Sequence, residues 1–405
     1  MFIGSVYPGA GVPVGQKIDI FAIPGHPSTG GGVGVRVEMG HADDVGAFAE
    51  ALARAAADRT VQSIVALACD ANGFTAAQLD PVLASVATPI IGGIFPALIH
   101  GREKLETGYI ILGLRESLRT VIVPDLSGRS VDYAVTLEGA LPIDESIATA
   151  FVFVDGLAGR IAALIDGVFQ VFGLEFTYIG GGAGSLSLEQ KPCVFTNAGL
   201  VADHAIIGLT TAEGRVEVRH GWEPVQGPFS VTESAGNRII SLDWTPAFDV
   251  YRAVVEPLAN VTISADNFFD VAKGFPFGLV RLNAEHVVRD PISVDGTDLV
   301  CVGEIPDYAV VDIMRGSGSG LIGAAREAGA AAAARATDGD APIFFVDCIS
   351  RVLYLDTRFQ DELDAVAFSG RRVVGALTLG EIAGSGRGYL EFYNKTAVVG
   401  VLEVQ

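Results

Sequence analysis

The sequence has few basic residues and no cluster of them. Its 405 residues include 27 Lys and Arg against 48 Asp and Glu, for a formal net charge of −21. Nucleic acids and acidic lipid surfaces are bound through Lys and Arg, so a chain this acidic repels both. We therefore expect no nucleic-acid partner and no membrane partner.

Cysteine and histidine are also scarce. The four cysteines form no CxxC pair, which argues against a zinc knuckle and against a disulfide framework. The six histidines form no HxH or HExxH pair, which argues against a histidine-based zinc site. One axial histidine is enough for haem. The cofactor is therefore unknown, with haem left open.

No apolar run is long enough to cross a bilayer, although 50% of the residues are hydrophobic. The most apolar region, residues 147–173, is interrupted by Asp155, Arg160 and Asp166. The first residues lack the basic start and apolar run of a secretory signal. We expect a cytoplasmic protein.

Glycine is abundant, with 50 residues, and the segments follow a repeated order. An apolar strand, a helical stretch, a second strand with glycines and a hairpin follow one another three times. The first strands of the repeats are predicted at 63–73, 149–159 and 341–351. This order predicts an α/β fold of repeated βαβ-plus-hairpin units that form two domains with mixed sheets. We place these domains at 1–220 and 221–405, meeting within residues 214–233.

The glycines of TYIGGGAGSL (177–186) have two compatible interpretations. A phosphate loop of the P-loop type would need a Gly-Lys-Ser/Thr sequence, and this stretch has no lysine. Gly180 and Gly181 are then either part of a tight turn at the end of a strand or the floor of a ligand pocket.

A second glycine motif suggests a rival function. Gly318, Gly320 and Gly323 form GxGxxG after a predicted strand and before an alanine-rich stretch of helical character. This order is typical of dinucleotide binding, so an enzyme that uses a nucleotide remains an alternative.

Several phrases in the second half of the chain form a specific series. They are HGWEPVQGPFSVTESAGNRIISLDWTPAFDVY (220–251), GFPFGLVR (274–281), VCVGEIP (300–306), FFVDCISR (344–351), ALTLGEIAG (376–384) and FYNKT (392–396). In this order they resemble the C-terminal domain of the FIST family, named for F-box and intracellular signal transduction proteins. The first half, with IIGG and YIGGGAG, resembles the FIST N-terminal domain.

The resemblance implies a sensory module that binds a small molecule. The family occurs in bacteria, archaea and eukaryotes, and amino acids have been proposed as its ligands. Some relatives are haem proteins that sense nitric oxide and regulate a histidine kinase. The resemblance leads us to expect a bacterial protein. Because the sequence contains no kinase, methyl-accepting or cyclic-nucleotide domain, we expect it to signal through a separate partner. A homo-oligomer is left open, and an enzyme is the less favoured reading.

Polar residues in the family-like phrases follow predicted strands and form the candidate site. Arg351 offers a planar fork for a carboxylate, while Glu381 and Asn394 could accept from an ammonium group. The alternative is an internal ion pair with a turn-forming Asn. Cys348 is either a thiol nucleophile or a buried core thiol. The full ligand-binding set is Arg351, Glu381, Asn394, Cys348, Gly180 and Gly181.

Overall fold

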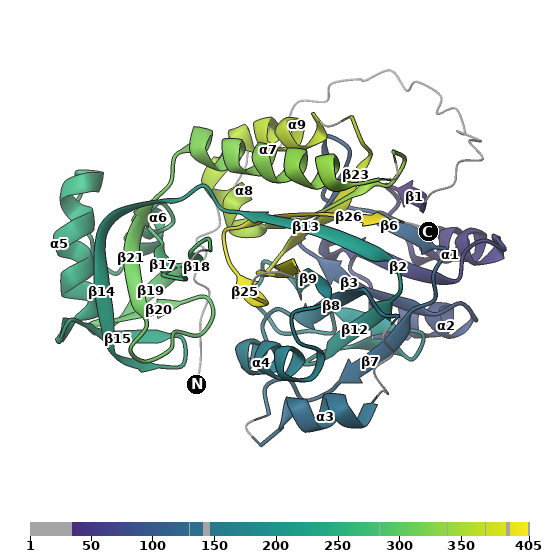
Figure 1. The fold of residues 1–405 in the computed structure, drawn as a ribbon, viewed down its shortest axis with the longest axis horizontal. Coiled ribbons are helices and arrows are strands. Elements are labelled where there is room, and N and C mark those ends of the chain that lie inside the picture. Colours follow the sequence, from purple (N-terminus) through teal and green to yellow (C-terminus); the bar gives the residue numbers. More distant parts are fainter. Residues whose placement is uncertain are drawn as a thin grey trace. The chain divides into compact units, whose positions relative to one another are not determined.

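The chain is described by a computed structural model, shown in Figure 1. It describes residues 35–128, 130–140, 146–282, 284–337, 339–368, 370–385 and 389–403. Among these residues, no helix is long and apolar enough to cross a membrane.

Three consecutive units share one order of elements: outer strand, helix, strand, helix, strand, hairpin and closing strand. The first unit comprises β1 (Arg36–Gly40), α1 (Val45–Ala57), β2 (Ser63–Cys69), α2 (Ala76–Ala84), β3 (Ile90–Phe95), the hairpin β4 (Ala97–His100) and β5 (Glu103–Leu105), and β6 (Tyr109–Leu114). The second comprises β7 (Arg119–Val123), α3 (Tyr133–Ala140), β8 (Thr149–Asp155), α4 (Ile161–Phe172), β9 (Thr177–Ala183), the hairpin β10 (Val194–Thr196) and β11 (Gly199–Val201), and β12 (Ala205–Thr210).

The third unit has the same order with two additions. It comprises β13 (Glu213–Arg219), α7 (Gly318–Arg335), β22 (Ile343–Cys348), α8 (Ile349–Leu355), α9 (Phe359–Ala367), β23 (Val373–Thr378), the hairpin β24 (Glu381–Ser385) and β25 (Glu391–Tyr393), and β26 (Ala397–Glu403). Two helices, α8 and α9, stand where the other units have one. Residues 223–315, here called the inserted segment, lie between β13 and α7.

The inserted segment forms a sheet of its own, in the order β18-β17-β21-β14-β15-β20-β19 with β16 paired to β15. Its elements are β14 (Glu223–Ala235), β15 (Arg238–Leu242), β16 (Thr245–Pro246), α5 (Ala247–Ala259), α6 (Phe268–Ala272), β17 (Phe277–Leu279), β18 (Val287–Arg289), β19 (Pro291–Asp295), β20 (Asp298–Cys301) and β21 (Val310–Arg315). The chain thus enters a new sheet between β13 and β14, inside the predicted joint at 214–233. The domain bounds 1–220 and 221–405 stay a prediction.

The three units exchange their hairpins. The sheets have the orders β1-β6-β2-β3-β10-β11, β7-β12-β8-β9-β24-β25 and β13-β26-β22-β23-β4-β5. In each, the first four strands come from one unit and the last two are the hairpin of another unit. Units one, two and three donate to units three, one and two, so the exchange closes on itself. The predicted α/β fold of repeated βαβ-plus-hairpin units with mixed sheets is confirmed.

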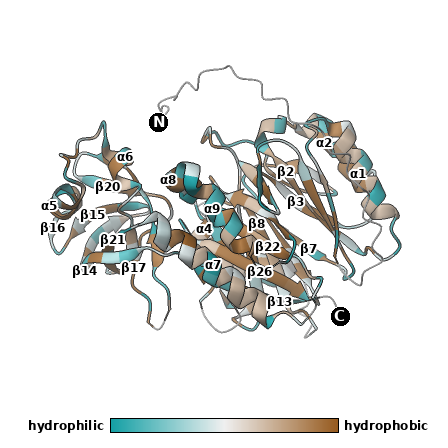
Figure 2. Ribbon diagram, turned by 90° about the horizontal axis from the view of Figure 1, so that it is seen from above, coloured by the Kyte–Doolittle hydropathy of each residue, from teal (hydrophilic) through white to brown (hydrophobic). Residues whose placement is uncertain are grey.

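The helices cover the outer faces of the sheets, and the inner faces share one core (Figures 1 and 2). Buried aromatic rings join the units there: Phe95 meets Phe153 with ring centroids 5.8 Å apart, and Phe151 meets Phe344 at 6.0 Å. Each of these contacts joins strands from different units, so the core depends on all three.

One glycine recurs at the same place in each unit, on the second strand of the parallel pair. A Cβ added there would lie 1.8–1.9 Å from the carbonyl oxygen of the facing residue. The pairs are Gly92 with Ala66, Gly180 with Val152, and Gly375 with Phe345. Gly180 and Gly181 therefore lie inside β9, which corrects the expected turn. These glycines allow two strand backbones to approach closely.

We predict that Gly375→Ala lowers the free energy of unfolding by roughly 1–3 kcal/mol, because the new methyl group overlaps the Phe345 carbonyl. Gly323→Ala is the matched control, since no atom lies within 4 Å of its added Cβ and it lies inside α7. There alanine should raise stability by about 0.5–1 kcal/mol. Urea denaturation measures both, and equal effects would contradict the close-approach argument.

Candidate functional site

Arg351 lies in α8 and is fully buried. Its Nη1 donates to the carbonyl oxygens of His220 (2.7 Å) and Lys395 (3.2 Å), and its Nη2 donates to that of Leu321 (3.0 Å). Its Nε donates to Glu362 Oε1 at 3.1 Å, and Nη2 contacts the same oxygen. Every guanidinium nitrogen is therefore used inside the protein, as in the internal ion pair that the sequence left open.

A second carboxylate, Asp347, faces the same guanidinium, with Oδ1 3.1 Å from Arg351 Nε. Burial, followed by the charge of Glu362, raises the pKa of Asp347 well above its usual range. Burial also raises the pKa of Glu362, and Arg351 opposes this. Because one cation faces two acids, we assign the ionised carboxylate to Glu362, the closer partner, and the proton to Asp347.

Cys348 and Glu381 are linked through Thr378, which pairs with Cys348 in the register of β22 and β23 and donates its hydroxyl to Glu381. Burial raises the pKa of the Cys348 thiol well above its usual value, so this thiol is a weak nucleophile. Burial also raises the pKa of Glu381 to about 8, although its carboxyl accepts from Thr378 Oγ1 (2.9 Å) and from the Thr396 backbone N–H (3.3 Å). The pKa of Glu381 thus lies above neutral pH, which favours its protonated form.

Asn394 lies in the turn between β25 and β26 and is 1% exposed. Within the described part of the chain, neither its amide nitrogen nor its amide oxygen has a hydrogen-bond partner. The next residue, Lys395, places Nζ 3.1 Å from Asp290 Oδ2 and 5.1 Å from the centre of the Trp222 ring. This turn therefore anchors the inserted segment through a buried ion pair.

The six predicted site residues do come together. Glu381 pairs with Gly181 in the register of β24 and β9, and Ile382 with Gly180. Thr378, the register partner of Cys348, donates to Glu381, and Arg351 reaches the carbonyl of Lys395 beside Asn394. All six are buried in the protein interior. Their contact with a ligand stays a prediction.

An open cavity of 660 Å³ lies close to this cluster, and we call it the charged pocket. It is bounded by β13, the end of α7, the hairpin β24–β25 and, from the inserted segment, Arg281, Ala284, Glu285 and Val287. Its arginines are Arg215, Arg219, Arg281 and Arg335, and its acids are Glu217, Glu285 and Glu391. Four cations against three anions make the lining net positive by one charge, in a chain of net charge −21.

Each of these acids pairs with an arginine of the pocket. Arg335 Nη1 lies 2.5 Å from Glu217 Oε1, where the arginine is 63% exposed and the acid 8%. Arg281 Nε lies 2.8 Å from Glu391 Oε1, and Arg219 Nε lies 3.8 Å from Glu285 Oε1. The last two pairs join the inserted segment to the third unit.

His220 connects the charged pocket with the buried cluster. Its Nδ1 accepts from the Trp222 backbone N–H at 2.9 Å, so the proton is assigned to Nε2, which lies 2.8 Å from Glu285 Oε2. Burial opposes ionisation of Glu285, but this hydrogen bond and the charge of Arg219 bring its pKa below the usual value. The His220 carbonyl accepts from Arg351.

The sequence interpretation missed the arginines of this pocket, although one signal was present. Residues 213–219 read EGRVEVR, and side chains alternate between the two faces of a strand. Arg215, Glu217 and Arg219 therefore share one face of β13. No sequence pattern indicates that Arg281 and Arg335 meet them, because that contact is tertiary.

The GxGxxG motif lies in the first turns of α7. The strand before it, β21, belongs to the sheet of the inserted segment, and the strand after it, β22, belongs to that of the third unit. A dinucleotide fold needs both strands in one parallel sheet. Gly318, Gly320 and Gly323 thus lack that context. The described residues also contain no group of three or more His, Cys, Asp or Glu that could hold a metal ion.

Family comparison agrees with the phrases in the sequence. The FIST N domain matches residues 63–245 and the FIST C domain matches residues 247–384. The chain belongs to the FIST family, whose domains are associated with sensory signal transduction and small-ligand binding. Comparison with curated proteins found no match.

We predict that Arg351→Ala lowers the free energy of unfolding by about 3–5 kcal/mol, because it leaves Glu362 buried without its cation. Arg326→Ala, on the exposed face of α7, is the control and should change stability by less than about 0.5 kcal/mol. Chemical denaturation measures both. A loss below about 1 kcal/mol for Arg351→Ala would contradict the role given to this ion pair.

The raised pKa of Glu381 predicts a pH dependence of stability. An unfolded chain ionises this carboxyl near its usual value of 4.5, whereas the folded protein keeps the proton until about 8. Its stabilising contribution is full below the first value and is lost as the pH rises through the second. Glu381→Gln should flatten this loss in melting curves recorded across that range. Parallel pH profiles for the two proteins would show that Glu381 does not titrate as proposed.

Proposed function

We propose that this protein is a small-molecule sensor that binds an organic acid or amino acid in the charged pocket and signals through a separate partner. The observation that carries the proposal is a net positive cavity on a strongly acidic chain. Screening removes most of the effect of distant acids, so nearby arginines decide which ligand binds.

The size and chemistry of the charged pocket suit such a ligand. Its 660 Å³ lies within the range of about 300–1,000 Å³ typical of small-molecule sites. Guanidinium groups bind carboxylates through two parallel hydrogen bonds. Glu217 and Glu391 supply acceptors for an ammonium group, which makes the pocket compatible with a zwitterion.

The ligand would lie at a junction. Arg281 comes from the inserted segment, whereas Arg219 and Arg335 come from the third unit. An anion held by both sides would compete with the Arg281–Glu391 and Arg219–Glu285 pairs that now join them. Binding would therefore change how firmly the inserted segment is held, and a partner that contacts both parts could detect the change.

The charged pocket suits an organic acid better than haem. Its lining contains no histidine, cysteine or methionine, its two tyrosines, Tyr389 and Tyr393, stand among charged side chains, and charged walls match an apolar macrocycle poorly. His220 and His286 lie with their Nε2 atoms on carboxylates, at 2.8 Å and 3.0 Å.

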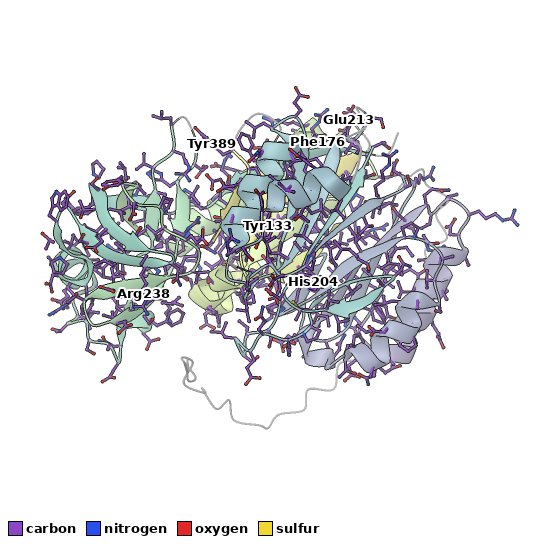
Figure 3. All side chains as sticks on the ribbon, turned by 90° about the horizontal axis from the view of Figure 1, so that it is seen from below. Tyr133, Phe176, His204, Glu213, Arg238 and Tyr389 are labelled. Carbon is purple, nitrogen blue, oxygen red and sulfur yellow. The ribbon has the colours of Figure 1, made fainter. Side chains whose placement is uncertain are left out.

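We predict that Arg281→Ala weakens the binding of an acidic ligand by roughly tenfold or more, because it removes a charge-assisted contact. Calorimetry with a panel of dicarboxylates and amino acids finds the ligand and gives the affinities. Arg238→Ala is the matched control: its pair with Asp295 is also at the surface, and Figure 3 places it well apart from Tyr389, which lines the charged pocket.

Two results would overturn the proposal. One is that no member of the panel binds the wild-type protein. The other is that Arg281→Ala and Arg335→Ala both keep the wild-type affinity, so that they do not differ from the control Arg238→Ala. Circular dichroism confirms that each variant is folded.

A further inference from the structure

A second cavity, of 400 Å³, lies at the attachment of the inserted segment, and we call it the second pocket. It is bounded by the end of α5, by α6, by the end of β21 and by α8. Two lining residues lie outside the inserted segment: Gly316, in the link between β21 and α7, and Tyr354 of α8. The second pocket shares no lining residue with the charged pocket.

The wall of the second pocket presents polar and apolar surface in about equal parts, and large side chains form the apolar part. Leu258 and Val261 line it and are 39% and 38% exposed, and Val271 and Phe275 lie beside them. Phe275 is nearly buried, so its ring forms a fixed surface. Large apolar side chains that converge on a concave surface mark sites where a ligand removes them from water.

One cation at this wall has no carboxylate partner among the residues that the structure describes. Arg315 ends β21, and its guanidinium lies over the Phe275 ring, 5.8 Å from the centroid. Glu223 lies opposite in the strand register, yet the described residues contain no ion pair to Arg315 within 4.0 Å. The arginines of the charged pocket, in contrast, all have acidic partners. The other cation here, Lys273, lies 3.7 Å from Asp270.

We propose that the second pocket binds a small carboxylic acid with an apolar or aromatic body. The carboxylate would pair with the Arg315 guanidinium, and the body would lie against Leu258, Val261 and Phe275. An uncharged analogue would lose the charge-assisted pair and bind weakly. The Tyr354 hydroxyl is already used on the Gly316 carbonyl at 2.7 Å, so it orients the wall rather than the ligand. This inference does not depend on the function proposed for the charged pocket.

The test uses phenylacetate as the probe and phenylacetamide as its uncharged analogue. Calorimetry on the full chain should show that phenylacetate binds and that phenylacetamide binds at least about tenfold more weakly. Arg315→Met keeps an apolar stem and removes the charge, so it should reduce the affinity for phenylacetate by a similar factor. Arg326→Met, on the exposed face of α7 and outside both pockets, should leave it unchanged.

A second variant keeps the test decisive if Arg315→Met does not fold. Ala259→Trp fills the second pocket from the end of α5 and should abolish phenylacetate binding without touching Arg315. Arg281→Ala, which alters the charged pocket, separates the two sites because it should not affect phenylacetate. The inference is overturned if phenylacetate does not bind, if the amide binds equally well, or if the filled variant retains full affinity.

Discussion

The buried guanidinium of Arg351 is the constraint on which the third unit depends. A fully buried cation must have its hydrogen bonds satisfied, and the protein supplies them from several elements at once. Carbonyl oxygens come from Leu321 in α7, from His220 in the turn after β13, and from Lys395 in the turn before β26. Glu362 of α9 supplies the charge. One side chain thereby fixes where the inserted segment leaves the unit, where the hairpin returns, and how three helices lie on the sheet.

The exchange of hairpins gives a second constraint, because no unit completes its own sheet. The third unit needs β4–β5 from the first, and the second needs β24–β25 from the third. The FIST N match ends at residue 245 and the FIST C match begins at 247, inside the inserted segment. The two matched regions therefore share sheets: β23 pairs with β4, and β24 pairs with β9. The boundary between the two matched regions in the sequence is therefore not a boundary between two separate sheets, because strands of each region pair with strands of the other.

The sequence predicted what local patterns encode. Apolar strands, amphipathic helices and recurrent glycines were enough for the repeated unit, and Gly92, Gly180 and Gly375 turned out to be equivalent. It also predicted that Arg351 and Glu381 would lie together. It left open that Arg351 forms an internal ion pair, but it could not predict Glu362 as the partner, because that contact depends on how α8 and α9 pack together. The charged pocket could not be predicted for a similar reason. The alternation of side chains in β13 is visible in the sequence, but Arg281 reaches the charged pocket only because of the path that the inserted segment takes.

The positions of the two cavities follow from how the inserted segment is attached. Lys395 holds Asp290 through a buried ion pair, and its Nζ also donates to the carbonyl of Lys273, which lines the second pocket. Opening this pair would leave a buried charge without its partner, so it resists being opened. In the charged pocket, the contacts are partly exposed pairs such as Arg281 with Glu391, which water and a competing anion can replace. In the second pocket, Arg315 has no carboxylate partner among the described residues, so an acid there adds a contact rather than exchanging one. The buried ion pair thus acts as a fixed point, and ligands in the two pockets would act on the inserted segment by different means: exchange of ion pairs in the charged pocket, and addition of one in the second pocket.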